Sequence, residues 1–188
     1  MDIGIVGCGN IGSYLSYFLY QNIIPNKINT IYLIDNDILE PKNFPYLFIN
    51  SRNRIGKKYI SNKKVYALKD ILEHYIRLDN NIHIVPLGIY YDNTDLSINN
   101  NTMLIDCRDN LNEFSNFKLK LSIDGSFGKI VVNPKDNNIN KKEPYRLRKN
   151  RFYSQLFCTL IVNSWKNLLN YKDRAEFILD LKEFRIMI

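Results

Sequence analysis

The sequence predicts an α/β fold of the Rossmann type: a mostly parallel sheet flanked by helices, with an antiparallel C-terminal portion. Three observations predict it. The apolar run Ile3–Val6 ends in glycines, as a buried parallel strand does. Residues 13–20 carry apolar side chains at helical spacing, and a second apolar run, Ile31–Ile34, ends in Asp35. A strand, a glycine turn, a helix, a strand and an acid in this order form the βαβ unit of dinucleotide-binding folds.

The middle of the chain continues the alternation of strands and helices. Pro41 and Pro45 exclude a helix interior, so residues 36–56 are expected to form a long loop. The Asn-rich segment 92–101 is expected to be an exposed connection. Between and after these loops we expect a helix over 64–77 and strands over 82–85 and 103–105.

The C-terminal third predicts an antiparallel hairpin followed by a helix and a strand. The runs 119–123 and 129–132 flank a glycine-containing turn, which is typical of a hairpin. We expect a loop over 133–151, one helix over 153–169 and a last strand over 176–181. No internal repeat or linker is visible, so residues 1–188 are expected to form a single nucleotide-binding domain.

Composition and charge exclude several classes of protein. Three cysteines far apart and two histidines argue against a structural zinc site and a disulfide scaffold. The first residues run straight into the glycine turn and do not resemble a signal peptide, and no apolar run approaches the roughly 20 residues of a membrane span. We therefore expect a cytoplasmic protein that does not bind membranes.

The net charge of +7 is concentrated partly in the basic stretch 141–151. Such a stretch can contact nucleic acid, an acidic protein or the phosphates of a nucleotide, but a solvated loop explains it equally well. We do not expect nucleic-acid binding.

The glycine turn predicts a phosphate site. Gly7 permits the tight turn, Gly9 lets the backbone approach phosphate, and Gly12 lets the helix pack on the strand. Backbone N–H groups at the head of the helix, here Asn10 and Ile11, face such a ligand. Asp35 lies where a carboxylate accepts the ribose hydroxyls. A turn kept for packing alone, with a solvated Asp35, is the alternative interpretation.

Four blocks in the right order resemble the ThiF/MoeB family, the ubiquitin-activating-enzyme-like adenylyltransferases. Residues 33–44 resemble its Asp-x-Asp-x-hydrophobic-Glu-x-x-Asn-Leu signature, and 105–110 resemble its hydrophobic-Asp-Cys-x-Asp-Asn block. Ile55-Gly56-Lys57 followed by Lys63-Lys64-Val65 resembles a Gly-x-x-Lys block before a helix, and residues 7–13 fit the opening turn. The resemblance covers about residues 2–132 and extends more loosely to the end of the chain.

The resemblance implies a divergent domain that binds ATP and Mg²⁺ and adenylates the C-terminal carboxylate of a small ubiquitin-fold or sulfur-carrier protein. It implies that Asp35 and Asp37 contact the nucleotide, that Asn43 lies near the phosphates, and that Asp109 binds the metal. Lys64 neutralises phosphate charge in this scheme, with Lys57, Lys58 and Lys63 as alternatives. One carboxylate suffices for Mg²⁺ because phosphates and water complete its coordination. Family members work in pairs, so a homodimer or heterodimer is expected.

The sequence also departs from the family pattern. Tyr46 stands where members place an arginine, and a tyrosine supplies neither the charge nor the donors of a guanidinium. Arg52 or Arg54 is the candidate replacement, and no arginine stands at Glu113. The chain begins at the first strand, so we expect no preceding arginine-bearing helix. No cysteine lies between Arg108 and Phe157, so thioester chemistry is not expected.

Two further functions stay open at this stage. The missing arginines allow a catalytically weak or inactive partner subunit with the same fold. The glycine turn alone also permits an NAD-binding oxidoreductase, although the acidic blocks around Asp35 and Asp109 favour ATP and a metal.

Overall fold

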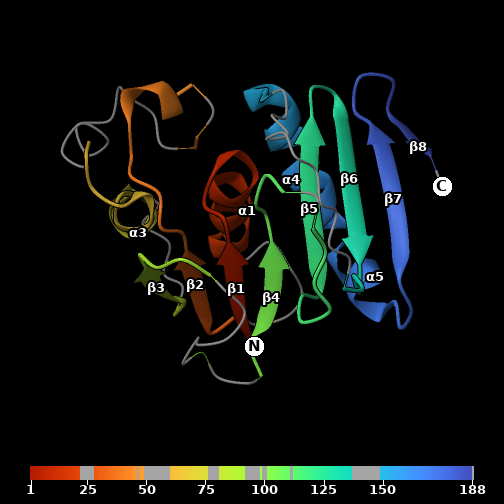
Figure 1. Cartoon of the computed structure of the whole chain (residues 1–188), viewed down its shortest axis with the longest axis horizontal. Coiled ribbons are helices and arrows are strands. Elements are labelled where there is room, and N and C mark those ends of the chain that lie inside the picture. Colours follow the sequence, from red (N-terminus) through yellow and green to blue (C-terminus); the bar gives the residue numbers. More distant parts are fainter. Residues whose placement is uncertain are drawn as a thin grey trace.

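A computed structural model describes residues 1–21, 28–45, 47–48, 60–75, 81–91, 98, 101–110, 112–136 and 149–187. Its centre is an eight-stranded sheet with the strand order β3-β2-β1-β4-β5-β6-β7-β8 (Figure 1). Helices α1, α4 and α5 lie behind the sheet in this view. The α/β class predicted from the sequence is confirmed.

The first half of the sheet is parallel. β2 pairs with both β1 and β3, and β1 also pairs with β4, all in parallel register. β3 is the edge strand and contains Pro86, which an edge tolerates because one side of the strand needs no donor. The elements of this half are β1 (Asp2–Val6), α1 (Asn10–Tyr20), β2 (Thr30–Ile34), the 3₁₀ turn η1 (Pro41–Asn43), α3 (Lys64–Tyr75), β3 (His83–Leu87) and β4 (Met103–Asp106).

The strand order reverses at β1. After β1 the chain passes through α1 to β2 and β3 on one side, and it then returns to β4 on the other side of β1. Ligands of open α/β sheets bind outside the carboxyl ends of the strands at such a reversal. The topology therefore directs attention to the residues that follow β1, β2 and β4.

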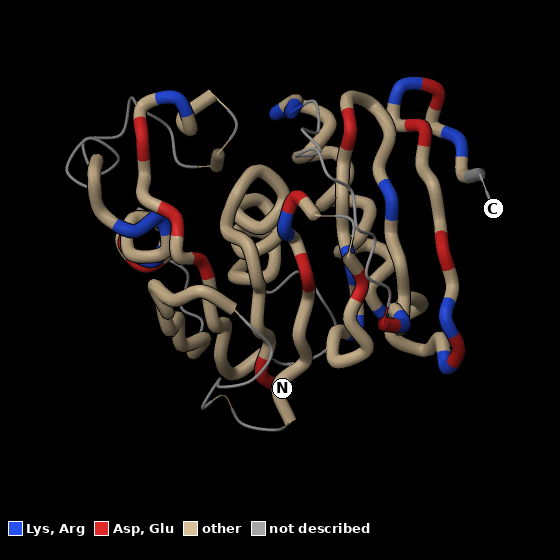
Figure 2. Tube along the Cα trace, in the orientation of Figure 1, with Lys and Arg blue, Asp and Glu red and all other residues tan. Residues whose placement is uncertain are grey.

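The second half is antiparallel except at its junction with β4. β5 lies parallel to β4, with Asp106 opposite Lys120, and then pairs antiparallel with β6, as the predicted hairpin requires. β7 and β8 continue the antiparallel order to the far edge of the sheet. The elements are β5 (Leu119–Asp124), β6 (Phe127–Val132), α4 (Arg151–Asn163), α5 (Trp165–Asn170), β7 (Ala175–Asp180) and β8 (Arg185–Met187). Figure 2 shows acidic positions within β7 and basic positions in the segments on either side of it.

Several boundaries differ from the sequence expectation. The single helix expected over 153–169 is wrong: α4 and α5 are separated at Ser164, and the break turns Trp165 into the core, where it is fully buried. Apolar spacing alone does not show this break, because both helices keep their apolar side chains toward the core. β8 was not expected, because most of its side chains are exposed and leave no alternating pattern. The expected loop 36–56 contains η1, and β3 runs on to Leu87.

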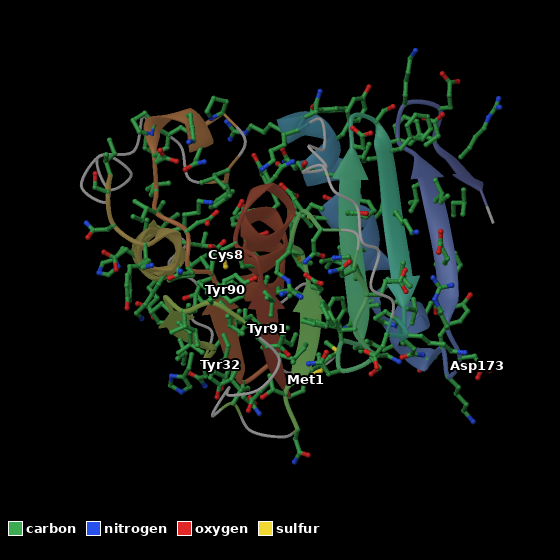
Figure 3. All side chains as sticks on the ribbon, viewed as in Figure 1. Met1, Cys8, Tyr32, Tyr90, Tyr91 and Asp173 are labelled. Carbon is green, nitrogen blue, oxygen red and sulfur yellow. The ribbon has the colours of Figure 1, made fainter. Side chains whose placement is uncertain are left out.

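Two apolar clusters cover the two faces of the sheet. The larger one joins the sheet to α1, α3, α4 and α5. The smaller one, on the opposite face, contains Val6, Ile34, Tyr91 and Phe117, and Figure 3 shows Tyr91 in front of the central strands. None of the helices in the described ranges is long and apolar enough to span a membrane.

Candidate functional site

A cleft of about 210 Å³ lies at the carboxyl ends of β1, β2 and β4, where the strand order reverses. Segments that are far apart in the sequence meet there: the glycine turn, the loop after β2, the start of α3, the segment after β3, the loop after β4 and the entry to α4. Its lining residues are Val6, Gly7, Gly9, Ile34, Asp35, Asn36, Asp37, Lys64, Ile89, Tyr90, Tyr91, Cys107, Arg108, Asp109 and Lys149.

The glycine turn forms the floor of the cleft, and its geometry requires glycine at two positions. Gly7 has a φ of 90°, a conformation that side chains rarely adopt. A Cβ on Gly12 would lie 2.0 Å from the carbonyl oxygen of Gly7. A Cβ on Gly9 would instead meet open space. The turn therefore leaves room for a ligand at Gly9, directly before the first residue of α1.

Asp35 lies between the glycine turn and the loop after β2. Its carboxylate accepts hydrogen bonds from the backbone N–H of Cys8 and of Asp37, each at 2.7 Å. Burial raises the pKa of this carboxyl above its ordinary value, and the nearby Lys64 partly offsets the rise. A carboxylate has about four lone-pair sites, so Asp35 keeps acceptor capacity for hydroxyl groups of a ligand.

Lys64 supplies a buried positive charge on the side of the cleft formed by the loop after β2, which we call the β2 wall. It is the first residue of α3, only 6% exposed, and its Nζ lies 2.6 Å from a carboxylate oxygen of Asp37. The side chain of Asp37 is 72% exposed, so its other contacts are with solvent. Lys63, one of the alternatives to Lys64, does not line the cleft, but its Nζ donates to Asn36, which does.

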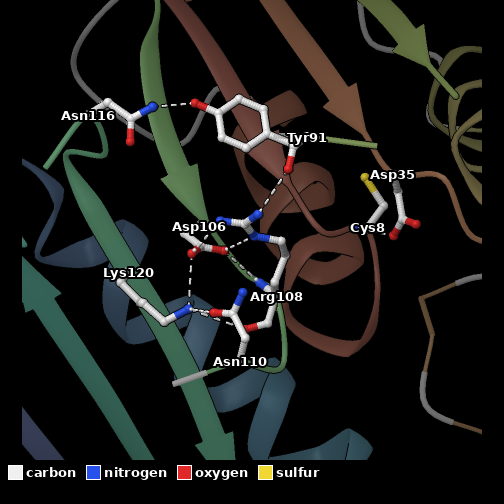
Figure 4. A network of polar contacts seen from close by, with 8 residues as sticks. All are labelled: Cys8, Asp35, Tyr91, Asp106, Arg108, Asn110, Asn116 and Lys120. Carbon is white, nitrogen blue, oxygen red and sulfur yellow. Dashed lines mark hydrogen bonds and ion pairs between the residues drawn. The ribbon is translucent and has the colours of Figure 1, made fainter. Parts of the chain in front are cut away.

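The opposite wall rests on a buried charge network at the end of β4 (Figure 4). Asp106 is fully buried and accepts from the guanidinium and backbone N–H of Arg108 and from Nζ of Lys120. Lys120 also donates to the amide oxygen of Asn110 at 2.6 Å. The two cations satisfy both oxygens of Asp106, which a buried carboxylate needs in order to stay charged.

Arg108 ties this network to the opposite face of the sheet. Its guanidinium donates to the carbonyl oxygen of Tyr91 and lies 5.3–5.5 Å from the ring centres of Tyr91, Phe114 and Phe117. The ion pair of Arg108 with Asp106 and its contacts with the three aromatic rings therefore both hold the loop after β4 in place. This anchoring places Asp109, the next residue, at the cleft.

Asp109 faces the cleft with a partner that the sequence did not indicate. Its carboxylate forms a 2.8 Å ion pair with Lys149, the residue before the N-cap of α4. The two side chains are 41% and 38% exposed. Within the described ranges no group of three or more Asp, Glu, His or Cys side chains could hold a metal ion. A single carboxylate still suits Mg²⁺, which takes its remaining ligands from phosphates and water.

The site residues expected from the sequence fall into three groups. Gly7, Gly9, Asp35, Asp37, Lys64 and Asp109 line the cleft. Asn10, Ile11, Gly12 and Asn43 do not line it, and Asn43 instead accepts a hydrogen bond from the backbone of Glu40. Tyr46, Arg52, Arg54, Lys57 and Lys58 lie outside the described residues.

Nine lining residues were not among the ligand contacts expected from the sequence. Four of them, Val6, Ile34, Asn36 and Cys107, lie in or beside the matched blocks, and the other five are Ile89, Tyr90, Tyr91, Arg108 and Lys149. Of these five, Ile89, Tyr90 and Tyr91 follow β3 after Gly88, and their position after a parallel strand was the available signal. Arg108 stands between the two matched acids of its block, and Lys149 belongs to the basic stretch 141–151. Tyr90 is 76% exposed, and its ring makes the rim of the cleft partly aromatic.

The three cysteines are all buried. Burial raises the pKa of each thiol, that of Cys8 and Cys107 well above the ordinary value. A protonated, buried thiol is a poor nucleophile. These cysteines act as packing residues, and Sγ of Cys158 contacts the carbonyl oxygen of Ile11 across the α1–α4 interface.

Neither a protein-family model nor a curated protein sequence matches the chain. Solved structures do. Structures of E. coli MccB match with TM-scores of about 0.7 at 14–15% identity, and one solved with ATP is among them. A crystal structure of PaaA matches with a TM-score of 0.63 at 16% identity. MccB and PaaA are ThiF/MoeB-like proteins. The chain has the ThiF/MoeB-type fold.

The match covers 99% of this chain but 62% of the MccB and PaaA chains. The ThiF/MoeB-type fold thus extends through the antiparallel half and α4, beyond the block that the sequence resemblance covered most clearly. At this level of identity the likeness establishes the fold alone, and the chemistry has to be argued from the cleft.

Proposed function

We propose that this chain binds ATP with Mg²⁺ in the cleft and adenylates the C-terminal carboxylate of a small ubiquitin-fold or sulfur-carrier protein. The observation that carries the proposal is the meeting of Gly9, Asp35, Lys64 and Asp109 in one cleft at the strand-order reversal of a ThiF/MoeB-type fold. These features match the parts of a nucleoside triphosphate and its metal. The open glycine turn and the buried cation suit the phosphates, the acceptor suits the ribose hydroxyls, and the remaining carboxylate suits the metal.

Each part of the nucleotide has a candidate contact. The phosphates lie at Gly9 and the head of α1, where N–H groups and the helix dipole favour an anion. The free lone pairs of Asp35 accept the ribose hydroxyls. Ile89 and the ring of Tyr90 offer an apolar contact to the base. Lys64 Nζ exchanges its contact with Asp37 for one with phosphate oxygen.

The reaction is a displacement at the α-phosphorus. A carboxylate oxygen of the carrier protein attacks this atom, the bond to the bridging oxygen of the β-phosphate breaks, and pyrophosphate leaves with the electron pair. The backbone N–H groups and Lys64 stabilise the charge that builds up on the phosphate oxygens. Asp109 would hold Mg²⁺, which when bound would neutralise charge on the leaving group. The buried thiols supply no nucleophile, so the acyl adenylate is the product expected from the described residues.

Solved relatives of the fold support this choice of ligands. MccB has been crystallised with ATP, and with AMPCPP together with MccA. An adenine nucleotide and a peptide or protein partner are thus accommodated by a protein whose fold this chain shares. Because the chain spans 62% of the length of MccB, the partner and the oligomeric state, a homodimer or a heterodimer, remain part of the proposal.

A second candidate is a catalytically weak or inactive partner subunit. Asp109 is engaged by Lys149, and Tyr46 replaces the arginine that family members place after the signature asparagine. In this case the chain binds the nucleotide, or only presents its surface to an active relative, and catalyses little turnover.

Thermal unfolding with different nucleotides tests the binding proposal. We expect ATP with Mg²⁺ to raise the melting temperature and NAD to leave it unchanged, since binding to the folded state alone stabilises it. A rise with NAD alone would contradict the proposal and support an oxidoreductase.

Isotope exchange between pyrophosphate and ATP tests the reaction. We expect exchange that depends on a carrier protein with a free C-terminus and that is lost in Asp109→Ala. ATP binding without exchange supports the inactive subunit. Exchange that survives in Asp109→Ala would show the metal assignment to be wrong.

A further inference from the structure

The ion pair between Lys149 and Asp109 crosses the mouth of the cleft. Both residues line it, and the Nζ and carboxylate oxygen are 2.8 Å apart. Lys149 comes from the entry to α4 and Asp109 from the loop after β4, forty residues earlier in the chain. The side chains are 38% and 41% exposed, so solvent screens the pair, and such pairs open readily.

The position of Lys149 is unfavourable for α4 itself. Lys149 precedes the N-cap Asn150, Arg151 follows it, and the first turn of the helix contains no acidic residue. Cations at a helix N-terminus are repelled by the helix dipole. Arg151 donates to the hydroxyl of Tyr14 and does not line the cleft, so among the described residues of this helix end it is Lys149 that presents a positive charge to the cleft.

The charges that line the cleft make this cation significant for phosphate binding. Among the described residues, three carboxylates line it, those of Asp35, Asp37 and Asp109. Of the lining cations, Arg108 is already committed to the buried Asp106. Within this described lining, Lys64 and Lys149 are left to balance three acids, and a triphosphate adds further negative charge. Without a counter-charge, Asp109 repels the phosphates.

We infer that Lys149 is the counter-cation of Asp109. It competes with a divalent metal for this carboxylate. When metal is scarce, it provides the positive charge that allows nucleotide phosphates to bind beside Asp109. The inference rests on the proposed nucleotide cleft. It assigns to the entry segment of α4 a direct role in how strongly nucleotide binding depends on Mg²⁺. When Asp109 binds a metal, Lys149 is displaced from this carboxylate and contributes less to nucleotide binding.

A metal titration without nucleotide tests the competition. Mn²⁺ binding to the full chain is followed by electron paramagnetic resonance for the wild type, Lys149→Met and the control Lys166→Met, which removes a lysine from α5. We expect Lys149→Met to bind Mn²⁺ several-fold more tightly and Lys166→Met to equal the wild type. In an Asp109→Asn background, Lys149→Met should have no effect. Equal Mn²⁺ affinity in the wild type and Lys149→Met would overturn the inference.

A nucleotide titration tests the second half. The Kd of ATP is measured by calorimetry in excess MgCl₂ and in excess EDTA. We expect Lys149→Met to raise the ratio of the Kd in EDTA to the Kd in Mg²⁺ by roughly tenfold, the scale of one hydrogen bond to a charged group. An unchanged ratio would overturn the inference. If no protein binds ATP in either buffer, the proposed function fails, and the Mn²⁺ titration alone decides whether Lys149 and a metal compete for Asp109.

Discussion

The two walls of the cleft are built in different ways. On the β2 wall, backbone N–H groups hold Asp35, and the exposed Asp37 pairs with the buried Lys64. On the β4 wall, a buried network around Asp106 carries the loop, and the ligand-facing Asp109 stands outside that network. The β2 wall combines backbone N–H donors with a half-exposed ion pair, whereas the β4 wall is built on a buried charge network between neighbouring strands. The difference teaches that the matched acids have different roles: Asp35 and Asp37 both line the cleft, whereas on the β4 wall Asp106 is structural and Asp109 faces the cleft.

The largest expected effect is on the β4 wall. Asp106→Asn leaves Arg108 and Lys120 buried without a full counter-charge, so we expect a loss of about 3 kcal/mol in the free energy of unfolding. Asp37→Asn, on the exposed side of the other wall, should cost less than about 1 kcal/mol. Urea denaturation measures the free energy of unfolding of both variants. Equal losses would contradict the difference between the two walls.

The floor between the walls offers the next effect. Gly12→Ala brings a methyl group within 2.0 Å of the Gly7 carbonyl oxygen, so the turn has to shift, at a cost of about 2 kcal/mol. Gly9→Ala points into open space and should change stability by less than about 0.5 kcal/mol, but its methyl group occupies the phosphate cradle. Chemical denaturation should therefore show the larger loss of stability in Gly12→Ala. An ATP titration should show weakened binding in Gly9→Ala although its stability is nearly unchanged. A stable Gly12→Ala, or a Gly9→Ala that binds ATP normally, would contradict this view of the turn.

A smaller effect is expected at the head of α1. Both polar atoms of the Asn10 side chain are buried and have no hydrogen-bond partner among the residues that the structure describes. Asn10→Leu keeps the shape and removes this penalty, so we expect a gain of about 1 kcal/mol. Ser13→Ala is the matched control, because the Ser13 hydroxyl accepts from the backbone of Phe48 and its loss should be destabilising.

The same variant tests the predicted phosphate contact of Asn10. If its amide turns toward the ligand, Asn10→Leu weakens ATP binding although it stabilises the fold. Unchanged ATP affinity in a calorimetric titration would restrict the role of this position to its backbone N–H group.

The smallest expected effect is a pH dependence on the β2 wall. Burial raises the pKa of Asp35 above the ordinary 3.8, so the folded state binds this proton more tightly than the unfolded chain. Its contribution to stability is therefore present at low pH and is lost as the pH rises from about 4 through the raised pKa. We expect Asp35→Asn to flatten the decline in stability over this window. Urea midpoints at a series of pH values measure it, and parallel curves for the two proteins would contradict it.

The local elements of the site could be predicted from the sequence. Gly7, Gly9, Asp35 and Asp109 all lie within three residues of the end of a parallel strand, and apolar runs identify such strands without any alignment. The break at Ser164 and the strand β8 could not be predicted, because the first depends on how Trp165 fits the core and the second carries mostly exposed side chains. The contacts of Lys149 and Arg108 were missed for a related reason: the charge pattern of a loop does not show which strand end it meets.

The sequence by itself determined the fold class and the edge of the sheet at which a nucleotide would bind, because strand periodicity and the glycine turn are properties of short segments. Only the tertiary structure decided which charge faces which. Asp106 lies in a buried network with Lys120, whereas Asp109, three residues later, pairs with Lys149, an exposed lysine that precedes α4. Ion pairs between distant segments depend on strand order and register, and these are set by the packing of the whole sheet.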